Sequence, residues 1–467
     1  EGETSRPTLQ ALKEMPEAVR AQGGLLTAVR AGGLLLAVEP GDTTQTLYGF
    51  ACDIGTTTVV GYLLDLVTGE RLGVASTLNP QTRFGDDVVS RIDVASRDAA
   101  GLEALRAAIV QAIDELIGQV ASQAGIARER IYALSFVGNT CMHHLFLGLS
   151  PASLGRSPYV PVVASPLQVD AAELGLHAHP SAQAYVLPNI AGFVGADTVG
   201  VLLATRLLHK DGIRLAIDIG TNGEMALGSS ERMLVCSTAA GPAFEGAQLT
   251  FGMRAADGAI DHVAVVGNDI SIQALGYGKL RGICGSGAVD VVATLRRLGI
   301  IDPSGRFVSR EEVAARHGGR LAARIVNHGA GAAFLLAPGE LTANGQPIVF
   351  TQRDIRQLQL GKGAIRAGVE MLMQGLGVAP EQVTEVCLAG AFGNYIAPES
   401  ALEIGLLPRF PNAPITPVGN AAGTGAQMAL LSRAAWREAA QIRTRVEYIE
   451  LSLHPDFQQI FMDSMMM

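Results

Sequence analysis

The order of apolar and polar residues predicts that strands and helices alternate along most of the chain. Two apolar stretches, LYGFACDIG and TTTVVGYLLDLVTGERL, cover residues 47–72 and predict a strand, a tight turn and a second strand. Further on, IYALSFVG at 131–138 predicts a buried strand, and NTCMHHLFLGL at 139–149 predicts a helix that Asn139 or Thr140 caps. Between them, apolar residues at helical spacing predict a long amphipathic helix; they are Leu102, Leu105, Ile109, Ile113, Leu116 and Val120.

The same order of elements begins again at Ile213. The strings IRLAIDIG, EMALGS and MLVCSTAA predict three strands, with TNG as the turn between the first two. Later strings predict a helix at 353–377, a strand leading into a glycine turn at 383–396, and one helix at 420–440. We therefore expect two similar α/β subdomains with a cleft between them, over 47–211 and 212–467, the second including a connecting helix and tail.

Residues 1–46 form a smaller segment of a different kind. PTLQALKEMPEAVRAQ has helical spacing, and GLLTAVRAGGLLLAVEPGD predicts a hairpin around its Gly-Gly pair. The segment is too short to bury a core alone, so we expect it to dock on the rest of the chain as a linker or a remnant of an upstream domain. Because the sequence begins with Glu1 instead of Met, we expect a fragment of a longer protein.

Composition and charge narrow the class of protein. The chain has 467 residues, of which 48% are apolar and 17% charged, as expected for a well-buried α/β protein of two or three domains. The net charge of −9, without a basic stripe between aromatics, argues against nucleic acid as a partner. Apolar runs are too short to span a membrane, and the five dispersed cysteines favour neither disulfides nor a local metal cluster, so we expect a cytoplasmic protein.

The strings ACDIGTTT at 51–58 and AIDIGTNG at 216–223 are the main candidates for chemistry. In each, an aspartate (Asp53 or Asp218) ends an apolar strand, and a glycine (Gly55 or Gly220) opens the turn that follows. Backbone N–H groups in such a turn form a concavity that binds anions. Further candidate donors and backbone contacts are Thr56, Thr57, Thr58, Thr221, Asn222 and Gly223.

An aspartate beside a phosphate-binding turn calls for a cation between the two negative groups. We therefore expect Asp53 and Asp218 to hold Mg²⁺ through its water ligands, or to position a nucleophilic water. A single copy would be read as an ordinary strand-end turn, whereas two copies, one per subdomain, favour a phosphate clamp. The chain has no Walker P-loop, and GKGAIRAG does not directly follow a predicted strand, so the Rossmann fingerprint is also absent.

The doubled turn resembles the nucleotide site of the acetate and sugar kinase/Hsp70/actin (ASKHA) superfamily. Residues 51–58 and 216–224 match its two phosphate hairpins, and CLAGAFGNYI at 387–396 looks like its adenosine motif, with Gly390, Gly393 and Asn394. VGNTCMHHL and VGNAAGTGA resemble the starts of its two connecting helices, where small residues allow close packing. The resemblance implies a duplicated α/β fold, two subdomains around a nucleotide cleft, and ATP with Mg²⁺ as ligands.

Further strings narrow the resemblance to one branch of this superfamily. NPQTRFGDDVVSRI, GADTVG, AAGPAFEGA, RAADGAI and GICGSGAVD together look like the ATPase region of reductive activators of corrinoid-dependent methyltransferases. That resemblance implies ATP hydrolysis coupled to one-electron reduction of a Co(II) corrinoid protein to Co(I). In this family the electron comes from an N-terminal [2Fe–2S] domain, whose cysteine pattern this chain lacks.

Several single residues have alternative interpretations. Glu224 is a candidate to orient water or bind the metal, or is a solvated strand end. Gly285 and Ser286 look like another ribose- or phosphate-approaching turn, and Ser237 and Thr238 are candidates to contact a partner's cofactor. Asp197 is expected to cap a helix, and His143 and His144 to pack in the core. Three alternatives apply to one group of charged residues: they line the cleft, they form a partner surface, or they lie in an ordinary solvated loop. The residues are Arg83, Asp86 and Asp87.

Three other functions remain open at this stage. The first is a small-molecule kinase of the same fold, for which no catalytic aspartate stands out. The second is an activator of the 2-hydroxyacyl-CoA dehydratase kind, with a [4Fe–4S] cluster held between subunits by cysteines such as Cys141 or Cys284. The third is an actin- or chaperone-like binding module. The sequence also leaves the oligomeric state open, a homodimer included.

Overall fold

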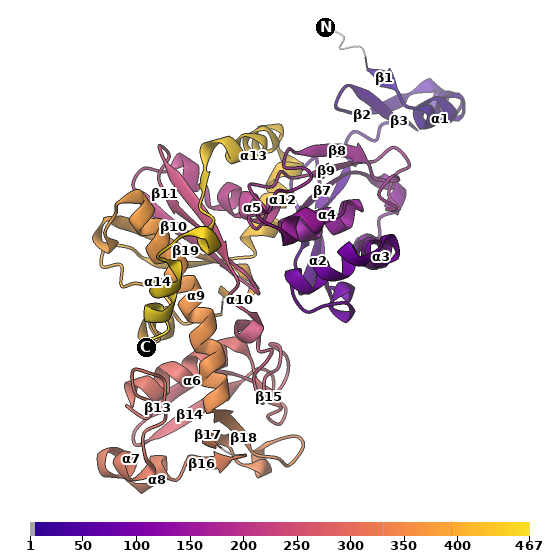
Figure 1. Ribbon diagram of the computed structural model, residues 1–467. Helices are drawn as coiled ribbons and strands as arrows, with labels where there is room; N and C mark the ends of the chain where they lie inside the picture. The colour runs from indigo at the N-terminus through magenta and orange to yellow at the C-terminus, as the bar shows by residue number, and fades with distance from the viewer. Residues whose placement is uncertain (1–4, 330, 394) are drawn as a thin grey trace. The chain divides into compact units, whose positions relative to one another are not determined.

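The computed structural model describes residues 5–329, 331–393 and 395–467. The chain divides into two compact units, each with its own core (Figure 1). The first unit comprises the residues up to Arg206 together with Ala421–Val446, and the second comprises Leu207–Asn420 and Glu447–Met467. A segment late in the sequence, 421–446, therefore packs with the first unit, although the sequence alone groups it with residues after 212.

The first unit begins with a small three-stranded sheet covered by one helix. Its strands lie in the order β1 (Arg6–Pro7), β3 (Leu34–Pro40), β2 (Leu26–Ala31), and α1 (Leu9–Arg20) packs on β3. The predicted hairpin is confirmed: β2 and β3 pair antiparallel across Gly32 and Gly33, whose φ angles of 57° and 81° suit a two-residue turn. The predicted helix is confirmed as well, capped by the Thr8 side chain.

A six-stranded sheet forms the centre of the first unit. The spatial order of its strands is β6-β5-β4-β7-β9-β8. The pairs β6–β5, β5–β4 and β9–β8 are antiparallel, whereas β4–β7 and β7–β9 are parallel. The strands are β4 (Tyr48–Ile54), β5 (Thr58–Asp65), β6 (Arg71–Leu78), β7 (Ile131–Gly138), β8 (Leu167–Asp170) and β9 (Gln183–Val186).

Helices cover both faces of this sheet. On one face, α3 (Ala99–Ala124) packs against β5 and β6; on the other, α12 (Ala421–Leu431) packs against β4 and β7. Residues two apart in a strand share a face, so Asp53 lies on the same face as Gly49, whose added Cβ would meet Leu430 of α12 at 3.0 Å. The remaining helices of the unit are α2 (Val88–Arg97), α4 (Thr140–Leu147), α5 (Ala196–Thr205) and α13 (Arg433–Arg445).

The second unit repeats this sheet. Its strand order, β12-β11-β10-β19-β20, has the same sequence of antiparallel and parallel pairings as β6-β5-β4-β7-β9, with β21 added at the edge beside β12. The duplicated α/β fold that the doubled string predicted is therefore confirmed. The strands are β10 (Ile213–Ile219), β11 (Gly223–Gly228), β12 (Met233–Thr238), β19 (Val383–Ala389), β20 (Ile415–Gly419) and β21 (Glu447–Tyr448).

The long helix α9 (Gln352–Leu376) packs against β11 and β12, and α14 (Phe457–Ser464) packs on α9. Two small sheets complete the unit (Figure 1). They consist of β13 (Ala259–Val266), β14 (Asp269–Ala274) and β15 (Gly282–Ile283), and of β16 (Ile325–His328), β17 (Gly331–Ala337) and β18 (Ile348–Thr351). The other helices are α6 (Gly285–Arg297), α7 (Arg310–His317), α8 (Gly319–Ala322), α10 (Gly390–Gly393) and α11 (Pro398–Glu403).

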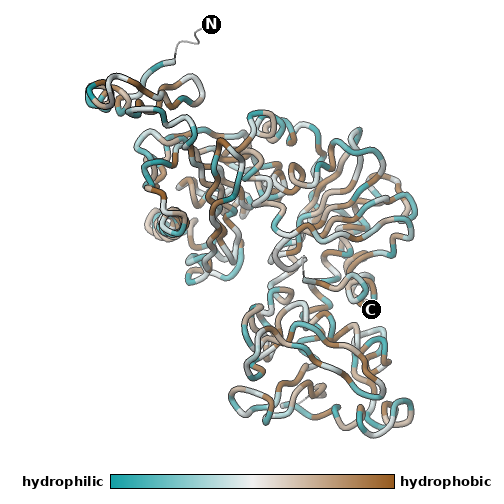
Figure 2. The backbone as a smooth tube through the Cα atoms, turned by 180° about the vertical axis from the view of Figure 1, so that it is seen from behind, coloured by the Kyte–Doolittle hydropathy of each residue, from teal (hydrophilic) through white to brown (hydrophobic). Residues whose placement is uncertain are grey.

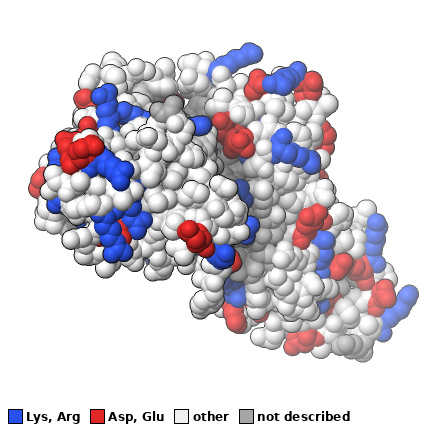
Figure 3. Space-filling view, turned by 90° about the horizontal axis from the view of Figure 1, so that it is seen from below, with Lys and Arg blue, Asp and Glu red and all other residues white. Residues whose placement is uncertain are grey.

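Figure 2 shows that the strands of both large sheets carry mostly hydrophobic residues, whereas the loops that join them are largely hydrophilic. On the face drawn in Figure 3, acidic and basic side chains lie interspersed in small groups, and neither sign forms a continuous band. Within the described part of the chain, no helix combines the length and the apolar character needed to cross a bilayer.

Two elements differ from their sequence-based predictions. The helix expected over 420–440 is two helices, because the Ser432 side chain accepts a hydrogen bond from Ala435 N and starts α13 with a new cap. The turn expected at Gly285 and Ser286 is the first turn of α6, a helix of 13 residues. Its neighbour Gly287 packs so closely on β13 that an added Cβ would lie 2.2 Å from the Ile260 carbonyl oxygen.

Candidate functional site

The first candidate hairpin connects β4 to β5 through Gly55, Thr56 and Thr57. An added Cβ at Gly55 would lie 2.4 Å from the Thr58 carbonyl oxygen, so only glycine fits this turn. Asn79 is fully buried and holds the turn from behind: its Nδ2 donates to Gly55 O at 2.8 Å, and its backbone N–H donates to Thr57 O at 2.8 Å. The backbone of the hairpin is thus fixed without any ligand.

A buried arginine supports the middle of the same turn. Arg91 of α2 is 0% exposed, and its guanidinium donates to Thr56 O at 2.7 Å and to Gly85 O at 2.9 Å. Asn139, which caps α4 by accepting from Met142 N, donates its Nδ2 to Thr56 Oγ1 at 2.8 Å. The cap at Asn139 was predicted from the sequence; its second bond, to the hairpin, was not.

The N-terminus of a second helix lies against this point. Gly195, the N-cap residue of α5, packs so closely that an added Cβ would lie 2.5 Å from the Cα of Asn139. The N-termini of α4 and α5 therefore meet beside Asn139, whose side chain reaches the first hairpin. The positive ends of the two helix dipoles favour an anion in this part of the unit.

The second hairpin connects β10 to β11 and is also internally fixed. Gly220 N donates to Asn222 O at 2.9 Å within the turn, and Gly241 N donates to Thr221 O at 2.9 Å from behind it. The hydroxyl of Thr221 donates to the carboxylate of Glu245. Gly223 faces α9, where an added Cβ would meet Ile365 at 3.0 Å.

Two carboxylates lie side by side at this hairpin. Asp218 and Glu224 are directly opposite in the antiparallel β10–β11 ladder, which places their Cβ atoms about 4.5–5.5 Å apart on one face. Glu224 is only 8% exposed, and its Oε1 accepts from Ser237 Oγ at 3.2 Å across the next strand pair. Paired carboxylate oxygens of this kind suit a hydrated divalent cation or a positioned water molecule.

The glycine of the expected adenosine motif lies against the same carboxylate. Gly390 follows β19, has a φ of +90°, and an added Cβ there would fall 2.5 Å from Asp218 Oδ1. The structure thus brings together Asp218, Glu224, Ser237 and the backbone of Gly390. Gly393 is buried against Leu388, and Asn394 lies outside the described residues. Thr238, next to Ser237, ends β12 opposite Gly223.

The other charged candidates have mostly local roles. Asp87 caps α2 by accepting from Ser90 N at 2.7 Å, and the Arg83 guanidinium lies 4.7 Å from the ring centre of Phe84. Asp197 is not at the N-cap position of α5, which is Gly195, but sits in the first turn and accepts from Thr198 N at 2.7 Å. Burial raises the pKa of Asp197 to about 6. Asp86 lies in the loop before α2.

The two histidines of α4 are packing residues. His144 Nε2 accepts from Val162 N at 2.9 Å, so its Nδ1 carries the proton and donates to Thr140 O at 2.7 Å. His143 is buried, and burial followed by the neighbouring His144 lowers its pKa to about 3, so it is neutral at physiological pH. The five cysteines are all buried and free. No metal-binding group of three or more His, Cys, Asp or Glu occurs within the described ranges.

Fold and local chemistry together define an ASKHA-type protein in which each of two homologous sheets carries a Gly-Thr hairpin after its first strand. Residues 48–210 match the family model described as the RACo middle region, and residues 212–467 match that of the C-terminal domain of RACo, the ASKHA domain. The chain therefore belongs to the RACo family of reductive activators of corrinoid proteins.

Named relatives are similar over most of the chain. The corrinoid activation enzyme RamQ of Eubacterium limosum is 37% identical over 458 residues, which cover 98% of this chain and 77% of that protein. The [Co(II) methylated amine-specific corrinoid protein] reductase of Methanosarcina barkeri is 26% identical over 400 residues, covering 78% and 66%. A solved structure of a reductive activator for corrinoid, iron-sulfur protein is 38% identical and covers 99% and 73%, with a TM-score of 0.88.

Proposed function

We propose that this chain hydrolyses ATP bound with Mg²⁺, and that hydrolysis drives the return of a corrinoid protein from Co(II) to Co(I). The observation that carries the proposal is the row formed by Asp218, Glu224 and the Gly390 backbone beside the second hairpin. Such a row offers carboxylates for a hydrated cation and a side-chain-free surface for a nucleotide. The names of the relatives, a corrinoid activation enzyme and a corrinoid protein reductase, support the substrate.

In this proposal the two hairpins bind the phosphates of one nucleotide. Their N–H groups act as donors at positions fixed by Asn79, Arg91 and the Gly220–Asn222 bond. Hydroxyl donors come from Thr56, Thr57 and Thr58, and further backbone donors from Thr221, Asn222 and Gly223. Gly390 and Gly393 approach the adenosine, and the first turn of α6, with Gly285 and Ser286, approaches the ribose or a phosphate.

Asp53 and Asp218 would hold Mg²⁺ through its water ligands, and Glu224 would orient the attacking water. The adjacency of Asp218 and Glu224 on neighbouring strands fits that group, since carboxylates and retained waters are the usual Mg²⁺ ligands. The cation supplies charge neutralisation for the phosphates. Ser237, which donates to Glu224, keeps that carboxylate in place.

Hydrolysis can drive an uphill reduction only if ATP and its products favour different conformations of the activator. We propose that the ATP-bound conformation holds the corrinoid protein in a state in which Co(II) accepts an electron, and that hydrolysis releases it. Each turnover converts Co(II) plus one electron to Co(I). The electron donor is the [2Fe–2S] domain that the family resemblance implies, or an added low-potential reductant in its place.

The test combines this chain, a candidate corrinoid protein in the Co(II) state and titanium(III) citrate as the electron source. Co(II) is followed by electron paramagnetic resonance, and phosphate release is measured in parallel. We expect Co(II) loss only with ATP·Mg, and we expect Asp218→Asn to slow both Co(II) loss and phosphate release about 100-fold. Asp93→Asn is the matched control, since Asp93 is 62% exposed on α2 and pairs only with a surface arginine.

Two results would contradict the proposal. Co(II) loss at the same rate without ATP would show that hydrolysis does not drive the reduction. ADP formation stimulated by a sugar or a carboxylic acid but not by any corrinoid protein, with the phosphoryl group transferred to that substrate instead of released as phosphate, would favour a small-molecule kinase of the same fold.

A further inference from the structure

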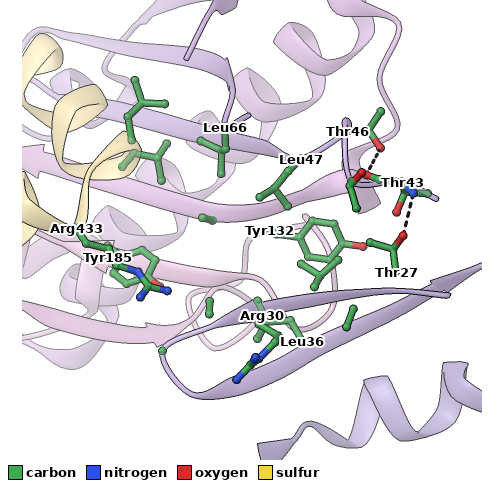
Figure 4. Close-up of a pocket in the computed structure, with 18 of the residues that line it drawn as sticks. Thr27, Arg30, Leu36, Thr43, Thr46, Leu47, Leu66, Tyr132, Tyr185 and Arg433 are labelled. Atoms are coloured by element: carbon green, nitrogen blue, oxygen red, sulfur yellow. Dashed lines mark hydrogen bonds between the residues drawn. The ribbon is translucent and has the colours of Figure 1, made fainter. Parts of the chain in front are cut away.

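A separate cavity of about 530 Å³ lies wholly within the first unit, and none of the residues that line it belongs to either hairpin turn. One wall is β2, the edge strand of the small sheet, and the opposite walls are β7, β9 and the corner between α12 and α13 (Figure 4). The volume falls in the range of small-molecule sites, about 300–1,000 Å³.

The middle of the cavity is apolar. Three leucines line it: Leu36 of β3, which is buried, Leu47 just before β4, and Leu66 just after β5. Ala133 of β7 and Leu430 of α12 complete this part of the lining. In Figure 4 the labelled leucines lie between the two ends of the cavity. A ligand that fills this part must itself be largely apolar.

One end of the cavity is closed by threonines that already have partners. Thr27 Oγ1 donates to Gly41 O at 2.8 Å and accepts from Thr43 N at 2.9 Å, and Thr46 Oγ1 donates to Thr43 O at 3.1 Å. These three bonds fix the loop between β3 and β4, and Figure 4 draws the two that join threonines. This end is a preformed wall.

The other end carries aromatic rings and positive charge. Tyr185 and Trp436 meet edge to face, with ring centres 5.3 Å apart. Arg433, the first residue of α13, lies beside Tyr185 (Figure 4). Burial raises the pKa of Tyr185, and the charge of Arg433 partly offsets this rise. Among the described residues that line the cavity, two are arginines, Arg30 and Arg433, and none is acidic. Arg30 donates to Ser5, and the carboxylate of Glu39 accepts from Tyr132 and Thr43. The positive charge at the aromatic end therefore comes from Arg433.

We propose that this cavity binds a small planar aromatic anion, such as an aromatic carboxylate or sulfonate, with its anionic group at Arg433. The rings of Trp436 and Tyr185 and the leucine-lined middle receive the apolar body, and the guanidinium receives the charge. An arginine beside aromatic faces is a frequent arrangement for planar anions, because its flat fork both stacks and donates two hydrogen bonds. The proposal is independent of ATP hydrolysis.

Trp436 makes the site directly observable, because it is the only tryptophan among the 467 residues. The probe is 8-anilinonaphthalene-1-sulfonate, and the matched neutral probe is N-phenyl-1-naphthylamine, which has the same rings without the sulfonate. With selective excitation of tryptophan, a probe bound in the cavity beside Trp436 emits by efficient energy transfer. We expect saturable emission at one sulfonate probe per chain and clearly weaker binding of the neutral probe.

Three variants separate the contributions to binding. Arg433→Gln should weaken the sulfonate probe about ten-fold or more and leave the neutral probe unchanged, since it removes only the charged hydrogen bonds. Arg437→Gln, on the same helix but outside the cavity lining, is the matched control and should change neither. Ala28→Phe fills the cavity from the exposed side of β2 and should abolish binding of both probes.

Circular dichroism and the thermal midpoint verify that each variant is folded. Absence of saturable energy transfer from Trp436 in the wild-type chain would overturn the proposal. Equal binding of the two probes, or insensitivity of the sulfonate probe to Arg433→Gln, would overturn the assignment to an anion. If the cavity binds only an extended peptide along the β2 edge, saturable energy transfer from Trp436 to the probe will be absent, and the proposal is overturned.

Discussion

At the scale of single residues, buried polar side chains determine the shape of the first hairpin. Arg91 has no exposed surface, and its guanidinium donates to two backbone carbonyls, Thr56 O and Gly85 O, as well as to the side chains of Gln81 and Met142. A buried carbonyl that loses its donor keeps the cost of its desolvation, and a hydrogen bond from a charged group contributes about 1.5–3 kcal/mol. The stability of the unit and the geometry of the hairpin are therefore linked through one side chain.

Arg91→Met should lower the free energy of unfolding by about 2–4 kcal/mol and also slow ATP hydrolysis, because the Thr56 carbonyl is released. Urea unfolding and phosphate release measure the two effects. Arg97→Met, on the same helix but with a 67% exposed side chain, is the matched control and should stay within about 0.5 kcal/mol of wild type. Equal effects of both variants would contradict the role assigned to Arg91.

Residues of this kind mark the limit of prediction from the sequence. The Asn139 cap was predictable because a cap and its helix are neighbours in sequence. Arg91 and Thr56 are 35 positions apart, and no local pattern shows that an arginine within DDVVSRI turns inward. Both Asn79 and Arg91 stand in the string that carried the family resemblance, but the string alone did not assign them a role.

A second buried charge gives a prediction about pH. Lys362 of α9 is 1% exposed and donates to the carbonyl oxygen of Met466. Burial, then Arg366 and Arg296, lowers its pKa from 10.5 to about 7. Between these values the unfolded chain binds a proton that the folded chain does not, so this lysine makes stability rise with pH by up to about 1.4 kcal/mol per unit. Below the folded pKa both states are protonated, and the full cost of burying the charge is present.

Lys362→Met removes that cost together with the bond to Met466. Relative to wild type, the variant should therefore be most stable near pH 6 and should lose this advantage as the pH rises to about 9. Urea unfolding across this range measures the difference. Lys13→Met, at an exposed position of α1, should show a difference that does not change with pH. A constant difference for Lys362→Met would show that the lysine stays charged in the folded protein.

At the scale of elements, the crossing of α5 and α12 organises the first unit. An added Cβ at Gly425 would lie 2.2 Å from Gly200 O, and one at Gly200 would lie 2.6 Å from Ala422 O. The two helix backbones are in direct contact, so any side chain at these positions forces them apart. The small residues of VGNAAGTGA predicted close packing of a helix, but not that its partner would be α5.

Gly425→Ala should lower the free energy of unfolding by about 1–3 kcal/mol, because overpacking has to be relieved by moving backbone. Gly118→Ala in α3 is the opposite case: its added Cβ would meet no backbone atom and only the guanidinium of Arg128, at 3.3 Å, which has to move by a few tenths of an ångström. That variant should stabilise the protein by about 0.5–1 kcal/mol, since alanine favours helix over glycine. Denaturant midpoints distinguish the two, and a neutral or stabilising Gly425→Ala would contradict the direct contact.

At the scale of the whole molecule, the sequence predicted the duplication well because each copy is a local pattern. One short stretch of sequence shows an apolar strand, a Gly-Thr turn and a second apolar strand, and this pattern occurs twice. The packing of 421–446 with the first unit could not be predicted, because the small residues of α12 do not show which distant helix they contact. The break at Ser432 was missed because apolar spacing continues across it.

The duplication also yields a prediction about how the two copies work together. We propose that both hairpins serve the same nucleotide, so Asp53→Asn and Asp218→Asn should each lower the kcat of ATP hydrolysis about 100-fold. The double variant should be no slower than the slower single variant, because loss of either carboxylate already misplaces the shared hydrated cation. Phosphate release is measured for the wild type, the two single variants and the double variant, which together form a double-mutant cycle. Asp93→Asn is the exposed control. If the two reductions multiply in the double variant, each hairpin acts on its own, and the clamp around one ATP is wrong.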